Sequence, residues 1–342
     1  MKQIKTTDAV GHVLCHDMTR IIKDVSKDAV FRKGHIVTEE DIPVLLSMGK
    51  EHLYVWEKTE DTLHEDEAAE MLRDMCTNKY MSASKPKEGK IELFSDIDGL
   101  FKVDVARLNR INALGEIIIA TRHTDTPVRK GDKLAGTRVI PLLIAKAKME
   151  KAADEAGSEP LMRIMPYQHK TAAIVVTGSE VYHGRIEDAF GPVIEEKLSE
   201  YEVDILSKTI VDDDTAKITG TVLEAIKSGA DLIICTGGMS VDPDDTTPTA
   251  IKNTSARLVT YGAPVLPGAM FLLAYYEAGG QDIPILGLPG CVMYAKRTIF
   301  DIVLPRIMAG EKLSAEDMSV LGHGGLCLKC DVCTFPNCGF GK

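Results

Sequence analysis

The chain has 342 residues and a formal net charge of −11, which excludes nucleic acid as a default partner, because non-specific nucleic-acid binding needs clustered Lys and Arg. No apolar run approaches the ~20 residues that cross a bilayer, and the N-terminus lacks the apolar segment of a secretory signal. We therefore expect a cytoplasmic protein that does not contact the membrane, in which the eight cysteines are thiols or metal ligands, because disulfides are rare in that compartment.

The N-terminal half predicts two small modules. Residues 1–85 predict a mixed α/β module, and residues 86–145 predict a strand-rich one. Within the first, hydrophobic spacing predicts a capped helix that starts near Thr38 and stops at Gly49. The remaining expected segments are a strand over 52–56, a helix over 64–79, a short linker over 82–89, a helix over 142–156 and a second linker over 146–170.

From Thr171 the pattern alternates between strands and helices, which predicts a doubly wound, mostly parallel α/β sheet over 171–312. Strands are expected at 172–177, 203–211, 231–236, 256–261 and 283–288, and helices at about 186–200, 214–228, 268–278 and 291–308. Ligands of such folds bind beyond the carboxyl ends of the strands. Three glycine-bearing loops follow strands and are expected to converge there: Thr177-Gly178-Ser179-Glu180, Thr236-Gly237-Gly238 and Gly287-Leu288-Pro289-Gly290.

The loop after the strand at 231–236 combines glycines with acids. Gly237 and Gly238 let backbone amides come close to a ligand, and Asp242, Asp244 and Asp245 follow within a few residues. Carboxylates beside a phosphate are costly unless a cation lies between them, and Mg²⁺ commonly takes one or two carboxylates together with substrate phosphates. The pattern therefore favours a phosphate site with Mg²⁺ over a solvated acidic loop.

Two more acids follow the strand at 203–211. Asp214 is predicted to cap the next helix, because Asp is a favoured N-cap residue, whereas Asp213 is free to project toward a ligand. Thr247 is similarly predicted to cap a helix that has Pro248 in its first turn, which leaves Asp245 with less of a structural role.

The C-terminal segment, residues 313–342, predicts a metal-binding tail. It holds four cysteines within 12 residues, separated by two, two and four residues: Cys327, Cys330, Cys333 and Cys338. The first two spacings are those of bacterial ferredoxin runs, whereas structural zinc sites usually separate two Cys-x-x-Cys pairs by a longer loop. The spacing favours an iron–sulfur cluster slightly over zinc, and unliganded thiols are the weakest interpretation.

Taken in order, these loops resemble the molybdopterin-binding domain of molybdenum cofactor biosynthesis proteins, the MogA, MoeA and gephyrin group. The resemblance covers about 140 residues, from Thr177 to about Gly310, and it includes the pair Asp213-Asp214 and the run Asp245-x-Thr247-Pro248. It implies a doubly wound α/β fold that binds molybdopterin and, with Mg²⁺, adenylates the pterin phosphate or inserts molybdate. Asp213, Asp242 and Asp245 match the acids of that chemistry. The implied cofactor-binding residues are Thr177, Gly178, Ser179, Glu180, Thr236, Gly237, Gly238, Ser240, Thr247, Pro289 and Gly290.

Three functions follow as hypotheses. The first is an enzyme that acts on molybdopterin and molybdate, and the second is a non-catalytic carrier that delivers Mo-molybdopterin to an apo-molybdoenzyme through the cysteine tail. The third is a nucleotide pyrophosphatase of the CinA-like kind. The resemblance also implies a homo-oligomer, either a dimer or a trimer.

Overall fold

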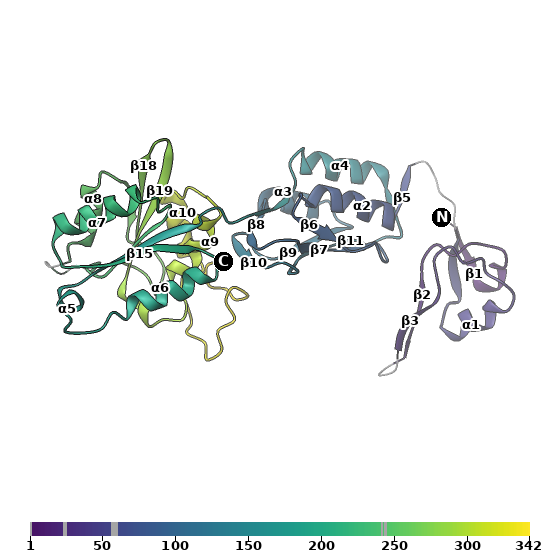
Figure 1. The fold of residues 1–342 in the computed structure, drawn as a ribbon. Helices are drawn as coiled ribbons and strands as arrows, with labels where there is room; N and C mark the ends of the chain where they lie inside the picture. The colour runs from purple at the N-terminus through teal and green to yellow at the C-terminus, as the bar shows by residue number, and fades with distance from the viewer. Residues whose placement is uncertain (1, 23–25, 56–60, 241, 243–244) are drawn as a thin grey trace. The chain divides into compact units, whose positions relative to one another are not determined.

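The computed structural model describes residues 2–22, 26–55, 61–240, 242 and 245–342 (Figure 1). The chain divides into two compact units. Unit 1 comprises residues 1–97, 101–124 and 129–164, and unit 2 comprises residues 98–100, 125–128 and 165–342. Two residues of the sequence predictions, Trp56 and Asp244, lie outside the described residues. Within the described part of the chain, no helix is long and apolar enough to cross a membrane.

The N-terminal part of unit 1 has a small core of its own, which includes Leu14, Leu45 and Leu53. Thr38 donates from its amide and its hydroxyl to the Asp41 carboxylate at the start of the predicted helix, and Gly49, with φ of +75°, follows its end, so that helix is confirmed. The elements are β1 (Lys2–Lys5), η1 (Thr6–Asp8), β2 (Met18–Ile22), β3 (Ser26–Phe31), α1 (Asp41–Ser47) and β4 (His52–Val55). Two antiparallel pairs, β1 with β4 and β2 with β3, organise this part.

The rest of unit 1 is built on an antiparallel sheet with the strand order β6-β7-β11-β9. The helix expected over 64–79 begins with a capping box at His64 and buries Leu72 and Cys76. The linker expected over 82–89 is wrong at its start, because Ser82 and Ala83 pair with β7 as part of β6. The elements between residues 62 and 165 are β5 (Thr62–His64), α2 (Glu65–Cys76), β6 (Met81–Ala83), β7 (Lys90–Ser95), β8 (Gly99–Val103), α3 (Val105–Asn112), β9 (Ile117–Thr121), β10 (Thr126–Val128), β11 (Lys133–Val139), β12 (Leu143–Ala145), α4 (Lys146–Ala156) and β13 (Met162–Met165). Of these, β10 and the first residues of β8 are assigned to unit 2.

Unit 2 contains a six-stranded mixed sheet with the order β15-β14-β16-β19-β18-β17. The first four strands in this order are parallel, and β18 and β17 are antiparallel to their neighbours. Two hydrophobic clusters cover its faces, one with residues of α6 and α9 and the other with residues of α7 and α8 (Figure 1). The elements are β14 (Thr171–Thr177), α5 (Ser179–Tyr182), α6 (Phe190–Ser199), β15 (Asp204–Val211), α7 (Thr215–Lys227), β16 (Ile233–Thr236), α8 (Thr247–Asn253), β17 (Arg257–Tyr261), β18 (Leu272–Ala278), β19 (Gln281–Leu288), η2 (Gly290–Met293), α9 (Ile299–Met308), α10 (Ala315–Ser319) and η3 (Val320–Gly322).

The helix predicted at 268–278 is wrong, because residues 272–278 form strand β18. The apolar run from Phe271 to Tyr275 is buried without a break, and a continuous apolar run does not distinguish a buried helix from a buried strand. Gly279 and Gly280, both with positive φ, form the two-residue turn that joins β18 to β19 as a hairpin. The helix expected at 291–308 begins only at Ile299, after the capping residue Thr298.

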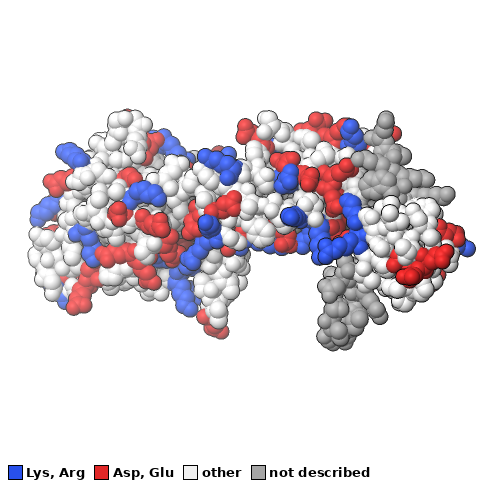
Figure 2. Space-filling view, turned by 45° about the vertical axis from the view of Figure 1, so that its right-hand side comes forward, with Lys and Arg blue, Asp and Glu red and all other residues white. Residues whose placement is uncertain are grey.

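Charges are mixed on the surface. On the face drawn in Figure 2, Lys and Arg side chains are interspersed with Asp and Glu. Among the residues described on that face, the positive charges do not gather into one extended area. An anionic ligand of this acidic chain therefore depends on local backbone amides and side chains rather than on a broad positive field.

Candidate functional site

The carboxyl ends of β14, β16 and β19 lie at one level of the sheet. Val176 is paired with Thr236, and Thr236 is paired with Leu288, so the loops that follow these strands leave from the same edge. The backbone of the first two loops is in direct contact, because a Cβ on Gly237 would lie 2.0 Å from the Thr177 carbonyl oxygen. The prediction that the three glycine loops converge is confirmed. We call residues 177–180, 236–240 and 289–290 the strand-edge loops.

Three buried threonines form a layer under the strand-edge loops. The Thr177 hydroxyl lies 2.9 Å from the Thr247 hydroxyl and 3.2 Å from the Thr236 carbonyl oxygen. Thr236 is fully buried, and its own hydroxyl has no hydrogen-bond partner among the described residues. A buried polar group without a partner is uncommon and indicates a ligand or water that is absent from the structure. Thr236 therefore marks a point at which a bound group is expected.

The glycine loop, residues 236–240, packs closely against Thr177 and Thr247. Gly237 has φ of +85° and Gly238 has φ of +52°, and a Cβ on Gly238 would lie 2.9 Å from the Thr247 hydroxyl. Only residues without a side chain fit there, because the turn packs against Thr177 and Thr247. The next residue, Met239, is buried, and its sulfur would lie 2.7 Å from a Cβ on Gly287, one residue before the end of β19. This contact links the glycine loop to the third strand-edge loop.

Tyr261, at the end of β17, holds the far side of the glycine loop. Its hydroxyl lies 3.0 Å from the carbonyl oxygens of Met239 and of Ser240 and donates to them. Burial raises the pKa of Tyr261, and the negative charge of Asp245 raises it further, so the phenol stays protonated and able to donate. Tyr261 was not predicted from the sequence, because no local motif indicates it and only the position of β17 at the edge of the sheet brings it to the loop.

The candidate acids already accept hydrogen bonds from the backbone. The carboxylate of Asp213 accepts from the Ser179 amide at 2.7 Å, and that of Asp245 accepts from the Asp242 amide at 3.1 Å. The amide of Ser179, one of the predicted cofactor-binding residues, is therefore already used by Asp213. Asp214 accepts from two amides at the start of α7, which confirms it as a helix cap.

The two acidic loops adjoin. Thr246, immediately after Asp245, donates from its hydroxyl to the Asp213 carbonyl oxygen at 3.4 Å. Thr246 rather than Thr247 is the N-cap residue of α8, and Thr247 is buried as its first residue. Asp242 is exposed, and Asp213 and Asp245 are partly exposed. The fold thus brings Asp213 and Asp245 to the same part of the edge.

The other candidate residues surround this edge with different exposure. Gly178 is buried with φ of +143°, and the Glu180 carboxylate oxygens would lie 3.3 Å from a Cβ placed on it. Pro289 is buried at the start of η2, whereas Gly290 and Ser240 are exposed.

Of the nearby cysteines, Cys235 is fully buried and burial raises its pKa to about 12, so it stays a neutral, packed thiol. Burial also raises the pKa of Cys291.

The donor set fits an anionic ligand better than a preassembled metal site. The orphaned Thr236 hydroxyl and the close amides of Gly237 and Gly238 suit phosphate oxygens. Within the described residues, no three His, Cys, Asp or Glu side chains are gathered as the ligands of one metal ion would be.

The four tail cysteines lie apart from this edge. Cys327 and Cys338 are partly buried, and Cys330 and Cys333 are exposed. All four line a single cavity of about 660 Å³. They share this cavity without being drawn together as a finished metal centre in the part of the chain that the structure describes.

Two family descriptions match the chain. Residues 173–309 match the family described as "Probable molybdopterin binding domain", and residues 3–57 match a domain of unknown function. A CinA-like protein of Mycobacterium avium (strain 104) is 36% identical over 94 residues, which are 28% of this chain and 22% of the relative. A CinA-like protein of Mycobacterium tuberculosis (strain ATCC 25177 / H37Ra) is 40% identical over 76 residues, 22% of this chain and 18% of the relative.

The tungsten cofactor synthesizing protein MoaB from Pyrococcus furiosus has 20% sequence identity and a TM-score of 0.35, and the match covers 41% of this chain and 93% of that chain. The chain spans only about a fifth of the length of the curated relatives it matches, at 22% and 18%. The family match instead spans β14 to α9, the strand-edge loops included. Residues 173–309 of this chain are thus similar to the family described as "Probable molybdopterin binding domain".

Proposed function

We propose that the strand-edge loops bind molybdopterin and that the protein promotes Mg²⁺-dependent insertion of molybdate in molybdenum cofactor biosynthesis. The observation that carries this proposal is the contact of Gly237 with the Thr177 backbone above the unpartnered Thr236 hydroxyl, with two acids beside it. A turn of this kind presents amides and a hydroxyl to phosphate oxygens, and the adjoining carboxylates supply the cation site. The family match of residues 173–309 supports the same ligand.

One group of residues would hold the ligand, and another would compensate its negative charge. The amides of Gly237 and Gly238 would position the phosphate of the pterin above the buried Thr236 side chain, and Tyr261 keeps the loop in place through Met239 and Ser240. Asp245 and Asp213 would hold Mg²⁺, which offsets negative charge on phosphate and molybdate oxygens. Their hydrogen bonds to the Asp242 and Ser179 amides fix where the carboxylates lie before ligand arrives.

Asp245→Asn is the sharpest test of this division. Asparagine keeps an oxygen that can accept from the Asp242 amide, so the turn is preserved while the charge is removed. We expect molybdopterin to bind with an affinity within about threefold of the native protein, and molybdate insertion to fall by at least a hundredfold, because removal of one group that compensates charge in the transition state costs roughly 3 kcal/mol.

The matched control is Asp214→Asn, which removes the same charge from the neighbouring helix cap while Asn still caps well. Both variants are assayed for molybdopterin binding by fluorescence and for insertion by reconstitution of an apo-molybdoenzyme. Undiminished insertion by Asp245→Asn, or an equal loss in Asp214→Asn, contradicts the proposed role.

A second candidate is a carrier that delivers Mo-molybdopterin to an apo-molybdoenzyme without turnover. The exposed apolar side chains Leu328 and Val332, at 78% and 76% exposure on the cysteine tail, favour it, because a docking segment presents such groups. The carrier predicts transfer of preloaded cofactor, no insertion of molybdate, and slower transfer by Leu328→Ser/Val332→Ser. Insertion with turnover would reject it.

The similarity to CinA-like proteins motivates a third assay, ADP-ribose hydrolysis, on the same purified protein. Hydrolysis of ADP-ribose that is lost in Asp245→Asn would assign the edge to a nucleotide pyrophosphatase instead. Light scattering of the purified protein tests the expected dimer or trimer.

A further inference from the structure

The tail forms a closed loop whose two ends are pinned to unit 2. The Gly341 amide donates to the Gly324 carbonyl oxygen at 3.0 Å, so the chain returns to its starting point after passing all four cysteines. At the first end, Leu266 donates to Gly325 and accepts from Cys327, both at 2.8 Å. We call residues 324–341 the cysteine loop.

The second end of the cysteine loop is held by packing. Phe340 is 5% exposed and belongs to the hydrophobic cluster on the α9 face of the sheet. A Cβ on Gly341 would lie 2.8 Å from the Ile302 side chain, so this glycine is also pressed against α9. The Lys342 ammonium donates to the Thr126 hydroxyl. Both ends of the cysteine loop are therefore fixed, and its middle contains neither helix nor strand.

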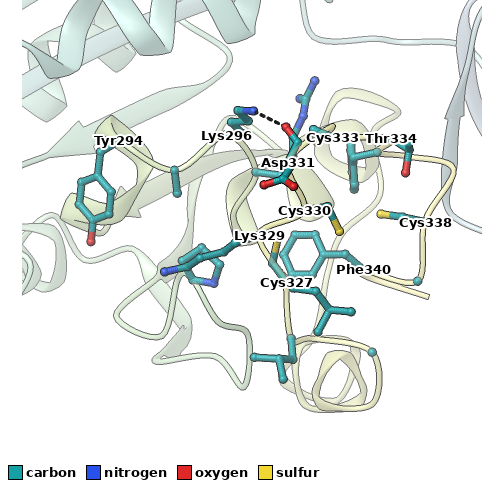
Figure 3. A pocket seen from close by; sticks show the side chains of 18 residues that line it. Tyr294, Lys296, Cys327, Lys329, Cys330, Asp331, Cys333, Thr334, Cys338 and Phe340 are labelled. Carbon is teal, nitrogen blue, oxygen red and sulfur yellow. Dashed lines mark hydrogen bonds between the residues drawn. The ribbon is translucent and has the colours of Figure 1, made fainter.

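The middle of the cysteine loop surrounds a cavity with its thiols. Cys327 and Cys338 pack against the hydrophobic cluster near the pinned ends, and Cys330 and Cys333 are carried on the exposed turn. Figure 3 shows Cys330 and Cys338 pointing toward one another across this cavity, which has a volume of about 660 Å³. Four thiols from one loop thus face one space.

Three cations line the same cavity: Lys296, Arg297 and Lys329. Lys296 donates to the Asp331 carbonyl oxygen at 3.3 Å, which fixes the exposed turn (Figure 3). The Arg297 guanidinium stacks over the Phe335 ring at 5.2 Å and donates to Asp301 at 2.8 Å. Four thiolates around a metal centre leave a net negative charge, and these cations offset it.

The geometry points to a cuboidal iron–sulfur cluster, held by Cys327, Cys330, Cys333 and Cys338, as the occupant: we propose that the cysteine loop is a [4Fe–4S] site. A single zinc ion with Zn–S bonds of ~2.3 Å would need its four sulfurs about 3.8 Å apart. No three cysteines of the described chain are gathered as the ligands of one ion, although all four face the same cavity. A cluster with iron at alternate corners of a cube holds its thiolates further apart, and it fills a larger space.

The spacing of the cysteines agrees with this choice. Two residues separate the first three cysteines in turn, as in bacterial ferredoxin runs. The proposal is independent of the molybdopterin site, because it assigns a separate group of residues and no step at the strand-edge loops. The experiment below therefore needs neither molybdopterin nor molybdate, and its failure leaves the proposed function untouched.

The test is anaerobic reconstitution of the full chain with ferrous iron, sulfide and a thiol reductant, followed by removal of unbound metal. We expect about four irons and four sulfides per chain, with broad visible absorption that bleaches on reduction by dithionite. Cys330→Ser/Cys333→Ser should retain less than a tenth of the iron. Both residues are exposed, so this variant is expected to fold, which circular dichroism checks.

Cys291→Ser is the matched control, since Cys291 is a partly buried thiol that does not line the cavity. It should bind iron as the native chain does. One tightly bound zinc per chain with no colour overturns the proposal, as does loss of all metal on desalting. Equal loss of iron from Cys291→Ser and from the double variant also overturns it, because the iron would then not depend on the cysteine loop.

Discussion

The strand-edge loops and the cysteine loop belong to the same unit, but different forces hold them. The strand-edge loops are set by the protein itself, through backbone contact at Gly237, a layer of buried threonines and the Tyr261 hydroxyl. The cysteine loop is pinned at its ends and is contacted in its middle by Lys296 and Arg297, while Leu328 and Val332 are 78% and 76% exposed. The strand-edge loops are thus held by their own packing, whereas we propose that the middle of the cysteine loop is ordered by the cluster it binds.

One segment joins the two regions. Residues 290–293 continue the third strand-edge loop as η2, and residues 294–297 line the cavity of the cysteine loop. Asp301 holds this segment, because its carboxylate accepts from Lys197 at 2.6 Å, from Arg297 at 2.8 Å and from the Thr298 amide at 2.7 Å. Asp301 is therefore the residue whose removal should disturb both regions.

Asp301→Ala should produce the largest effect. It leaves the Lys197 ammonium buried without its carboxylate, and removal of one partner from a buried ion pair costs ~3–5 kcal/mol. Urea unfolding of unit 2, followed by pulsed hydrogen exchange on peptides of α9, measures the change. Iron uptake by the cysteine loop should fall as well, because Arg297 loses its anchor.

The control is the double variant Lys197→Met/Asp301→Ala, which also removes the Lys197 ammonium that Asp301→Ala leaves without its carboxylate. We expect this double variant to recover at least about 1 kcal/mol relative to Asp301→Ala. A single variant that costs less than about 1 kcal/mol would show that the two regions do not share this anchor.

Gly237→Ala should have the next largest effect and is confined to the strand-edge loops. The new Cβ would lie 2.0 Å from the Thr177 carbonyl oxygen in a left-handed backbone conformation. Strain of ~1–2 kcal/mol adds to an overlap of ~1–3 kcal/mol, so we expect a loss of about 3 kcal/mol in the free energy of unfolding together with loss of molybdopterin binding.

Gly279→Ala provides the comparison for this effect, since Gly279 has φ of +59° and nothing within 4 Å of its Cβ position. It should cost about 1 kcal/mol, from backbone strain alone. If both glycine variants lose the same stability, the strand-edge loops are not preorganised by close packing.

Leu328→Ser should have the smallest effect. Its side chain is 78% exposed in the middle of the cysteine loop, and exposed substitutions usually change stability by less than about 0.5 kcal/mol. The same unfolding measurement on metal-free protein checks this. A loss above about 1 kcal/mol would mean that the cysteine loop packs on the protein without an occupant, which would remove the contrast between the regions.

Much of the site follows from local pattern. Glycines after parallel strands predict loops at one edge, and Asp214 before an amphipathic helix predicts a cap; both predictions are confirmed. The helix expected at 268–278 is wrong, because β18 is buried on both faces and has no periodicity that separates strand from helix. The Gly279-Gly280 pair is the local signal for the hairpin that was missed.

By itself, the sequence determined the order of the glycine loops, the acids beside them and the spacing of the four cysteines, because motifs and caps depend on neighbours along the chain. Only the tertiary structure decided that the Asp213 carboxylate accepts a hydrogen bond from the Ser179 amide, 34 residues away. It also decided that Tyr261 donates to the glycine loop and that the cysteine loop closes on Gly324. These contacts depend on which strands pair and which ends meet, and a local pattern carries no information about either.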